Sequence, residues 1–591
     1  MMTLNLIDAV PSVAMRPVGR TCRHEVGEKV KAFAEVAADE REITAMNEPV
    51  SASDDAATTA LDAVVIGAGF AGLYALHKLR DDLDLDVESF DDAGGVGGTW
   101  YWNRYPGARS DTEVIAYCYS FDRELYDEWQ WSERYPRQGE ILRYLNHVAD
   151  RFDLRRSITF DTTIERAWFN EETNRWDIST SSGRVIAAQF LVCGVGLLSS
   201  TNYPDIEGVE TFAGQTYHTA RWPHEGVGLE GKRVGVIGTG SSGVQCIAEI
   251  APHVGHLTVF QRRPQYSVPA QHGPIPQKLL DEIRRNYHGY WDSVRGSITA
   301  FGFPESDVPA MSVSAEERER VFEEAWNIGG GFRYMFATFS DIGVDPEANE
   351  AAASFIRQKI AEIVKDPVTA EKLTPYDLYA RRPLCDDGYF DTFNRDNVSL
   401  IDVGVQPIRK ITSEGVVTDE GVHELDVLVF ATGFDAVTGN YVKIDIRGRG
   451  GEKLREQWSD GPRTHLGLMI AGYPNLFMIF GPMGPFTNQP PAHEVQADWI
   501  TEAIEHVLEH DLGTIEPTVE AQNAWVGECN EIAHGTLFPK IDSWINGANV
   551  PGKPVSVMFY MAGMGAYCDR LRQTVETGYE GFALRGENVG A

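Results

Sequence analysis

Two glycine-rich stretches, Gly67-Ala-Gly-Phe-Ala-Gly72 and Gly238-Thr-Gly-Ser-Ser-Gly243, decide the fold predicted for this chain. Each stretch follows a short apolar run, Leu61–Ile66 or Arg233–Ile237, and opens a segment with a helical pattern. A strand, a tight glycine turn and a helix in this order form the βαβ unit that binds dinucleotides. The sequence therefore predicts an α/β fold with two Rossmann-like dinucleotide-binding domains.

The glycines of each loop have separate physical roles. The first permits the tight turn, the second lets the backbone approach a pyrophosphate, and the third lets helix and strand pack closely. The pyrophosphate then meets unpaired N–H groups at the helix N-terminus. The cofactor-binding residues predicted in the two loops are Gly67, Gly69, Phe70, Ala71 and Gly72, and Gly238, Thr239, Gly240, Ser241 and Gly243.

The residue that ends the second strand of each unit distinguishes the two cofactors. Asp91 lies 19 positions after Gly72, and Arg262 lies 19 positions after Gly243 and is followed by Arg263. A carboxylate accepts hydrogen bonds from ribose hydroxyls, whereas a guanidinium pairs with a 2′-phosphate. The first site therefore suits FAD or NAD, and the second suits NADPH. Because an N-terminal site is followed by a nested second site, we expect FAD in the first and NADPH in the second, with hydride passing from nicotinamide to flavin. The alternative for the second site is two surface arginines without a ligand.

The length of 591 residues predicts two or three domains. Charge-rich helical stretches at Ser314–Trp326 and Glu347–Val364 indicate a helical insertion, and strands are expected at 190–195 and 427–432. The predicted parts are a flexible N-terminal extension (1–60), the FAD-binding domain (61–195 and 426–591), the NADP-binding domain (196–270 and 376–425) and the helical insertion (271–375).

Bulk composition excludes several kinds of partner. The net charge of −35 argues against nucleic acid or an anionic membrane as a partner. The stretch from Leu466 to Pro491 is nearly uncharged, but its five prolines exclude a continuous spanning helix, so a strand followed by a buried loop is expected there. Seven cysteines without CxxC spacing indicate neither a disulfide framework nor a metal site, which favours a reducing cytoplasm.

A third motif lies between the two glycine loops. The stretch Phe212-Ala-Gly-Gln-Thr-Tyr-His-Thr-Ala-Arg-Trp-Pro223 fits the pattern FxGxxxHxxxWP, with Phe212, Gly214, His218, Trp222 and Pro223 at the fixed positions. It resembles the fingerprint of the Baeyer–Villiger monooxygenases, which are FAD- and NADPH-dependent enzymes. The resemblance implies that His218 positions a linker and takes no part in the chemistry. The alternative is a structural histidine whose hydrogen bonds are made within the core.

The resemblance extends from residue 61 to the C-terminal end. Residues 97–111 look like the flavin-contacting loop of the family, and residues 377–386 look like the loop that carries its catalytic arginine. By this resemblance Arg382 is the catalytic arginine, Asp111 is the acid that holds it, and Arg381 is a second contact to the 2′-phosphate. Lysine is usual in the family at the position of Arg381, so a planar guanidinium group takes the place of a compact ammonium group. The other cofactor-binding residues implied are Gly98, Thr99, Trp100 and Tyr117.

The C-terminal third is similar to the cyclohexanone-type members of the family at residues 481–491 and 543–553. The resemblance implies a mostly apolar substrate pocket and places Trp544 on a loop that folds over NADP. Those members carry leucine at the positions of Phe480 and Gln489, so the resemblance does not fix the substrate range of this chain. Plain core packing is the alternative for each of these residues. The predicted pocket residues are Phe480, Phe486, Thr487 and Gln489.

The predicted function is insertion of one oxygen atom from O2 next to a ketone carbonyl, which gives lactones from cyclic ketones and esters from linear ones. Arg382 stays charged at any relevant pH, so it can stabilise a developing oxyanion without supplying a proton. The alternatives are a flavin monooxygenase that oxidises nitrogen or sulfur, and a flavin-binding protein without turnover. We expect O2 and a small-molecule ketone as partners, and a monomer or weak oligomer.

Overall fold

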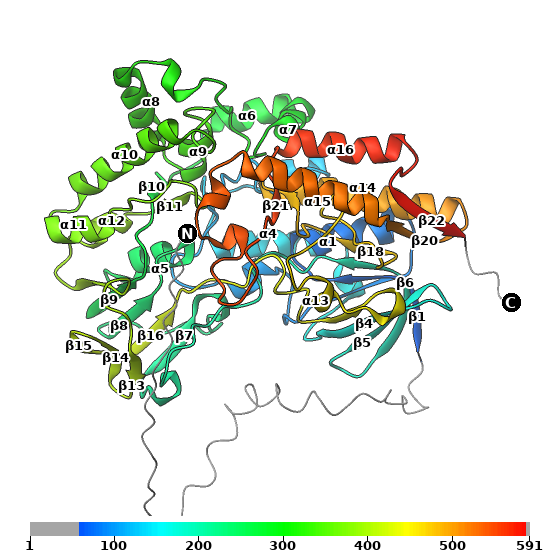
Figure 1. The fold of residues 1–591 in the computed structure, drawn as a ribbon, viewed down its shortest axis with the longest axis horizontal. Helices are drawn as coiled ribbons and strands as arrows, with labels where there is room; N and C mark the ends of the chain where they lie inside the picture. Colours follow the sequence, from blue (N-terminus) through cyan, green and yellow to red (C-terminus); the bar gives the residue numbers. More distant parts are fainter. Residues whose placement is uncertain (1–57, 587–591) are drawn as a thin grey trace, which may run out of the picture. The chain divides into compact units, whose positions relative to one another are not determined.

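The computed structural model describes residues 58–586. The predicted N-terminal extension therefore falls almost entirely outside the described residues, and its last two residues already belong to strand β1 (Thr59–Ile66). The described residues form one compact unit that contains both predicted nucleotide-binding domains and the insertion (Figure 1).

The first sheet is built around β1, as the first glycine loop predicts. Its strand order is β17-β4-β5-β6-β1-β2-β3, and β18 also pairs with β6. Strands β6, β1, β2 and β3 run parallel, with Ala63 opposite Val87, while β4, β5 and β6 pair antiparallel. The remaining strands of this sheet are β2 (Val87–Phe90), β3 (Ile158–Thr159), β4 (Ile164–Asn170), β5 (Arg175–Thr180), β6 (Val185–Cys193), β17 (Asp445–Arg447) and β18 (Leu476–Met478).

The second sheet is entirely parallel, in the order β12-β9-β8-β16-β7. Its strands are β7 (Gln215–His218), β8 (Arg233–Ile237), β9 (His256–Gln261), β12 (Val398–Asp402) and β16 (Val427–Phe430). The predicted domain boundary at 425/426 is wrong, because β16 forms backbone hydrogen bonds with β8 and β7. Residues 427–430 therefore belong to the second sheet and not to the last part of the FAD-binding domain.

The two helices that follow the glycine loops are α1 (Phe70–His77) and α5 (Ser241–Ile250). The helical segment expected after the first glycine loop is thus confirmed, and it continues as a π-helical turn at Lys78–Asp82. Between the first loop and β3 lie α2 (Thr99–Trp102), α3 (Arg123–Glu128) and α4 (Gln138–Arg151). The predicted fold class, two Rossmann-like units with a helical insertion, is confirmed.

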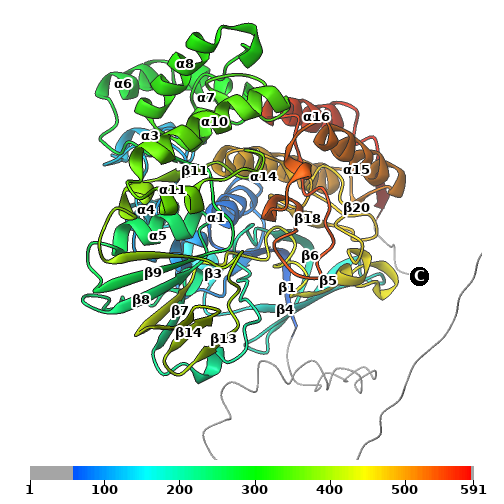
Figure 2. The ribbon, with the colours of Figure 1, turned by 60° about the vertical axis from the view of Figure 1, so that its left-hand side comes forward.

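The insertion consists of α6 (Gln277–Arg285), α7 (Tyr287–Gly296), α8 (Ala315–Ile328), α9 (Gly331–Phe336), α10 (Pro346–Ile363) and α11 (Pro367–Leu373). These helices gather on the upper left in both views (Figures 1 and 2). The side chains of Ser314 and Asp345 accept backbone N–H groups at the starts of α8 and α10, which satisfies donors left free by the first turn. Strand β10 (Ser267–Pro269) leads into the insertion and pairs with β11 (Leu384–Asp386), through which the chain returns. It is followed by α12 (Tyr389–Thr392) and the antiparallel strands β13 (Lys410–Thr412), β14 (Gly415–Thr418) and β15 (Gly421–Glu424).

The C-terminal part packs on the first sheet. It contains α13 (Leu454–Gln457), β19 (Gly484–Pro485), α14 (Gln489–Glu509), β20 (Leu512–Pro517), α15 (Val519–His534), β21 (Phe559–Tyr560), α16 (Met564–Glu576) and β22 (Phe582–Gly586). Helix α14 packs against α1. The proline-containing stretch 466–491 holds β18 and a buried loop, as predicted, and its end opens α14. Among the described residues, no helix is long and apolar enough to cross a membrane.

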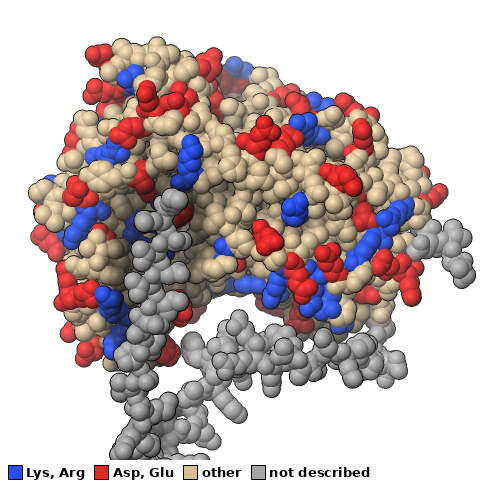
Figure 3. Space-filling view, in the orientation of Figure 1, with Lys and Arg blue, Asp and Glu red and all other residues tan. Residues whose placement is uncertain are grey.

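Acidic and basic side chains are interspersed on the molecular face drawn in Figure 3, and the described residues form no continuous basic area on that face. This distribution agrees with the net charge of −35. A site for an anionic dinucleotide must therefore be built locally, from backbone N–H groups and a few arginines.

A buried carboxyl group ties α14 to the rest of the unit. Glu494 is 1% exposed and accepts the backbone N–H groups of Ser120 (2.5 Å) and Phe121 (3.0 Å). The Ser120 hydroxyl also donates to it, and Arg295 of α7 lies 3.5 Å away. Burial raises the pKa of Glu494 to about 7, although Arg295 and Ser120 oppose that rise.

This raised pKa predicts a pH-dependent stability difference. Between the ordinary glutamate pKa and about 7, the folded state binds the Glu494 proton more tightly than the unfolded state, so this carboxyl destabilises the fold progressively as pH rises. Over the whole window the loss is about 3 kcal/mol. Glu494→Gln lacks this contribution. In urea unfolding, the free energy of unfolding of the variant relative to the wild type should therefore rise between pH 5 and pH 8.

Glu505→Gln, at an exposed position on the same helix, is the matched control for the loss of one negative charge. The altered hydrogen bonds of Glu494→Gln change its free energy of unfolding by the same amount at every pH. A difference from the wild type that does not vary with pH would therefore contradict the raised pKa.

Candidate active site

The first glycine loop is shaped as its pattern predicts. Gly67 has φ +112°, a conformation that L side chains rarely adopt, and a Cβ on Gly72 would lie 1.7 Å from the Gly67 carbonyl oxygen. These two glycines are therefore required by the turn and by the contact between helix and strand. Gly69 faces Gly98, whose Cα would lie 3.3 Å from an added Cβ, so the loop meets the predicted flavin-contacting segment backbone to backbone.

Asp91 lies at the end of β2, against this loop. Its Oδ2 accepts the N–H of Ala68 at 2.6 Å and its Oδ1 accepts the N–H of Ala93 at 2.8 Å. Burial raises the pKa of Asp91 to about 6, although these two backbone donors oppose the rise. Asp91 thus holds the glycine loop, and its predicted contact with a ribose stays a prediction that uses the remaining lone pairs of the same oxygens.

The predicted flavin-contacting segment brings aromatic side chains to the same loop. Gly98, with φ +52°, precedes Thr99, which begins the short helix α2. The Trp100 indole N–H donates to the Tyr117 hydroxyl at 3.2 Å, and the Phe70 ring lies 5.5 Å from the Tyr117 ring. The structure therefore brings together Phe70, Trp100 and Tyr117, which the sequence assigns to one cofactor site.

The second loop repeats the geometry and adds evidence for a ligand. Gly238 has φ +108°, and a Cβ on Gly243 would lie 2.3 Å from the Gly238 oxygen. Gly240 has φ −79°, which any residue can adopt, and a Cβ there would meet no protein atom within 4 Å. Contacts within the protein therefore do not require glycine at 240, whereas a pyrophosphate lying against the loop does. The loop fits a dinucleotide phosphate.

The arginines predicted to hold a 2′-phosphate form one cluster. Desolvation and the nearby charges of Arg263 and Arg381 lower the pKa of Arg262. Arg381 pairs with Asp377 at 2.5 Å, while its Nη1 is buried without a hydrogen-bond partner. Arg263 pairs with Asp542, in the loop before Trp544, at 3.2 Å. Three guanidinium groups with an unsatisfied donor fit a phosphate dianion.

His218, the histidine of the central motif, is 1% exposed. Its Nδ1 accepts the N–H of Ala220 at 3.1 Å, so the proton lies on Nε2, which is 3.3 Å from the Thr432 hydroxyl. That hydroxyl donates to the Asn202 carbonyl at 2.6 Å. Burial lowers the pKa of His218 to about 4, so the ring is neutral at physiological pH. This geometry supports the positioning role, because the ring joins β7 to the segments that follow β6 and β16.

The other members of the motif flank β7: Phe212 and Gly214 precede it, and Trp222 and Pro223 follow it. A Cβ on Gly214 would lie 2.5 Å from the Asp426 oxygen and 2.6 Å from the ring of Phe212. Trp222 is buried and its ring lies 5.4 Å from that of Tyr217, while the Pro223 carbonyl accepts the N–H of Gly226. These contacts are structural and none reaches the residues assigned to chemistry.

Arg382 and Asp111 meet as the resemblance predicts, although 271 positions separate them. Arg382 Nη1 donates to Asp111 Oδ2 at 2.6 Å and to the Ser241 hydroxyl at 3.1 Å. The guanidinium carbon lies 4.9 Å from the centre of the Phe332 ring. The FAD-binding part supplies Asp111, the second glycine loop supplies Ser241, and the insertion supplies Phe332. A permanently charged donor is thus held at the junction of three parts of the chain.

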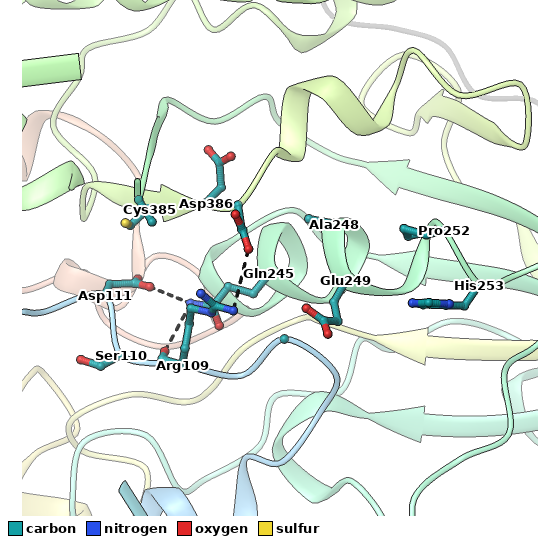
Figure 4. Close-up of a pocket in the computed structure, with 13 residues that line it drawn as sticks. Arg109, Ser110, Asp111, Gln245, Ala248, Glu249, Pro252, His253, Cys385 and Asp386 are labelled. Carbon is teal, nitrogen blue, oxygen red and sulfur yellow. Dashed lines mark hydrogen bonds and ion pairs between the residues drawn. The ribbon is translucent and has the colours of Figure 1, made fainter. Parts of the chain in front are cut away.

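A polar cavity of about 190 Å³ lies beside this pair (Figure 4). Its lining includes Arg109, Asp111, Gln245, Glu249 and Asp386. None of the four predicted pocket residues lines it, so it is distinct from the apolar pocket expected for a ketone.

The predicted pocket residues connect to Arg382 through the insertion. The Thr487 hydroxyl donates to the Thr299 carbonyl at 2.5 Å, so it is already engaged with the segment that leads to Phe301. The Phe301 and Phe332 rings stack at 4.1 Å, and Phe332 lies against Arg382. An aromatic wall therefore runs from Thr487 to the guanidinium group.

Aromatic contacts also join the predicted pocket to the C-terminal loop. The Phe486 ring lies 5.3 Å from the Phe559 ring, which lies 6.0 Å from the ring of Trp544. Phe480 is buried with φ +59°, and its N–H donates to Gln496 at 2.7 Å. Gln489 is partly exposed at the start of α14. The pocket assignment of all four residues stays a prediction.

Three residues of this region escaped the sequence prediction. Gln245 donates to Asp111, Tyr105 donates to Gln245, and the Phe332 ring lies against Arg382. The only available signal for Gln245 was its place four positions after Ser241, and this signal is weak because the same helix also carries Ser242 and Glu249. No comparable signal marks Phe332, because its place depends on how the insertion folds back.

Similarity to known proteins agrees with this geometry. The model of the family described as flavin-binding monooxygenase-like matches residues 61–268. A Baeyer–Villiger monooxygenase of Pseudooceanicola batsensis is 56% identical over 519 residues, which cover 88% of this chain and 95% of the relative. A phenazine N-monooxygenase of Lysobacter antibioticus is 51% identical over 530 residues, which cover 90% of this chain and 98% of the relative.

The crystal structure of cyclohexanone monooxygenase from Rhodococcus sp. Phi1 bound to NADP⁺ has a TM-score of 0.88 and 55% sequence identity. The match covers 90% of this chain and 100% of that chain. Two nucleotide-binding units that meet at a guanidinium–carboxylate pair define a two-dinucleotide flavin monooxygenase. The chain belongs to the Baeyer–Villiger monooxygenases, and its cofactors are FAD and NADPH, as the two glycine loops and the central motif predict.

Proposed function

We propose that this protein converts cyclic ketones to lactones and that Arg382 and Asp111 are its catalytic pair. The observation that carries the proposal is the 2.6 Å contact between Arg382 Nη1 and Asp111 Oδ2 beside Ser241 of the second glycine loop. The 55% identity to a cyclohexanone monooxygenase over its full length supports a cyclic ketone as substrate.

The chemistry assigned to this pair follows from its charges. When bound, FAD accepts hydride from NADPH and activates O2 for transfer to the substrate. The Arg382 guanidinium donates hydrogen bonds and does not act as an acid. It therefore stabilises negative charge on the substrate oxygen as the ketone carbon becomes tetrahedral. Asp111, 7% exposed, orients the guanidinium through one carboxylate oxygen. Overall, one atom of O2 is inserted between the carbonyl carbon and its neighbour to give the lactone, and the other atom leaves as water with the two electrons that NADPH supplies.

The pocket residues suggest which ketones enter. Phe480 and Phe486 would supply apolar surface, and Phe301, stacked on Phe332 beside Arg382, would supply more. Gln489, for which the structure records no intramolecular hydrogen bond among the described contacts, adds one polar group at the start of α14. We therefore propose a cyclic ketone whose ring is apolar and that carries a hydrogen-bonding substituent away from the carbonyl.

Oxidation of a ring nitrogen is a second candidate, because one relative of 51% identity is a phenazine N-monooxygenase. A heteroaromatic substrate also suits an aromatic-lined pocket. The two candidates differ in the product and not in the consumption of NADPH.

The test is a product assay on the purified holoenzyme with NADPH. Cyclohexanone, cyclopentanone, an aryl ketone, a linear ketone and phenazine are each incubated, and lactone, ester or N-oxide is measured by mass. We expect caprolactone from cyclohexanone at a yield near one per NADPH consumed. Brisk N-oxide formation without a lactone or ester from any ketone would replace the first proposal with the second.

A further inference from the structure

Gln245 of α5 contacts the carboxylate of the proposed catalytic pair (Figure 4). Its Nε2 donates to Asp111 Oδ1 at 2.6 Å, while Arg382 occupies Asp111 Oδ2 at the same distance. Gln245 and Asp111 are 6% and 7% exposed, so both contacts lie away from bulk water. Each oxygen of Asp111 therefore has its own charged or amide donor.

The orientation of this amide is fixed by its neighbours. An ionised carboxylate only accepts, so the amide nitrogen of Gln245 must face Asp111 and its oxygen must face Tyr105. The Tyr105 hydroxyl lies 2.8 Å from Gln245 Oε1 and donates to it. Burial raises the pKa of Tyr105, which keeps this hydroxyl protonated and able to donate. The result is a directed chain from Tyr105 through Gln245 to Asp111 and Arg382.

The same helix also contacts the other member of the pair. Ser241, at the start of α5, accepts from Arg382 Nη1 at 3.1 Å. Positions 241 and 245 lie four residues apart and therefore share one face of the helix. One helix face, immediately behind the second glycine loop, thus holds both Arg382 and Asp111.

We propose that Gln245 is a positioning residue for oxygen transfer: it fixes Asp111, and through it Arg382, in register with the second glycine loop. The proposal deepens the proposed function, on which it rests, by naming the group that sets the geometry of the catalytic pair. Gln245 acts through Asp111.

The surroundings explain why an amide is needed at this position. Asp111 lines the polar cavity, and the side chain of Arg109, which is only 6% exposed, lines it too. Arg109 contacts His272 and has Asp387 at 3.8 Å, so its charge is only loosely paired. Gln245 also donates to the Arg109 carbonyl at 3.3 Å. If the amide is lost, Asp111 Oδ1 opens to the cavity and to a second guanidinium that competes with Arg382.

The test compares three variants of the holoenzyme. In Gln245→Met the side chain keeps its length and loses both polar contacts. In Gln245→Glu the shape is kept, and a second carboxylate faces Asp111. Tyr105→Phe is the milder companion, because it removes only the donor that orients the amide. The ionisable groups around this position are Tyr105, Arg109, Asp111, Cys246, Glu249, His253, Arg382, Cys385, Asp386 and Asp387.

The first measurement is the yield of oxygenated product per NADPH, from pH 6 to pH 9. We expect the yield to fall about fivefold or more in Gln245→Met, with hydrogen peroxide in place of product, while anaerobic flavin reduction by NADPH stays within twofold. Tyr105→Phe should fall less, in the same direction. In Gln245→Glu the yield should be lowest at high pH and recover toward the wild type as pH falls, because a neutral carboxyl again donates to Asp111.

The second measurement is the melting temperature of each variant over the same pH range, which needs no substrate. The difference between Gln245→Glu and the wild type should widen as pH rises, because two carboxylates then face each other, and Gln245→Met should show a constant difference. A parallel pH course for both variants, or an unchanged yield in Gln245→Met, would overturn the proposal. A wild type that makes only N-oxide overturns the proposed ketone substrate instead, and the yield of N-oxide per NADPH in the same variants then tests the role of Gln245.

Discussion

Replacement of Arg382 with alanine is expected to remove oxygen transfer and to leave hydride transfer in place. Product formation should fall at least about 100-fold, since loss of one donor to a developing oxyanion costs about that much in other enzymes. NADPH oxidation should continue and release hydrogen peroxide. The reason is that Arg382 lies with Asp111 at 2.6 Å, at the junction where the substrate oxygen would acquire charge. Stopped-flow flavin reduction and product mass measured on the same preparation separate the two steps.

Arg382→Lys is the matched control for this prediction. Lysine keeps the positive charge but not the planar fork, so it cannot contact both Asp111 and Ser241 in the observed geometry. We expect it to recover part of the product formation and to remain far below the wild type. Unchanged product formation in Arg382→Ala would remove this residue from the mechanism.

Replacement of Arg262 with alanine is expected to act on the other substrate, NADPH. The KM for NADPH should rise about 10- to 100-fold, which corresponds to the loss of one charge-assisted contact. The KM for NADH should change less than threefold, because NADH lacks the 2′-phosphate. The structural reason is that the charges of Arg263 and Arg381 act on Arg262, which places three guanidinium groups around one position.

Arg263→Ala serves as the comparison within the cluster. Arg263 is paired with Asp542, so its removal takes away one cation and also releases one carboxylate. A smaller rise in the KM for NADPH is therefore expected than for Arg262→Ala. Equal effects of Arg262→Ala on NADPH and NADH would contradict the phosphate assignment.

Much of the fold was predictable because its signals are local. The strand at Arg233–Ile237 and the helices after both glycine loops form where the pattern places them. The roles of the first and third glycines are likewise local, since they follow from φ at Gly67 and Gly238 and from contacts within a few residues. Strand partners are less local. The strand at 427–430 was correctly predicted, but its sheet was not, because an apolar strand carries no mark of its neighbours.

The candidate site shows the same division. Asp91 was identified by its distance from the loop, yet only the structure shows that it accepts the N–H groups of Ala68 and Ala93. Arg382 and Asp111 were named from a resemblance, and no spacing in the sequence brings together two residues 271 positions apart. Gln245 was missed because a glutamine on a buried helix has no distinct pattern until its partners are known.

The sequence by itself therefore determined that the chain builds two dinucleotide-binding βαβ units, and which of them favours FAD and which NADPH. Short-range geometry encodes both conclusions: a glycine turn between strand and helix, and one charge at a fixed distance beyond it. The tertiary structure alone decided how Asp111, Ser241, Gln245 and Arg382 meet. Their contacts join a loop of the first unit, the first turns of α5 and the segment after the insertion, and only the packing of these parts sets those distances.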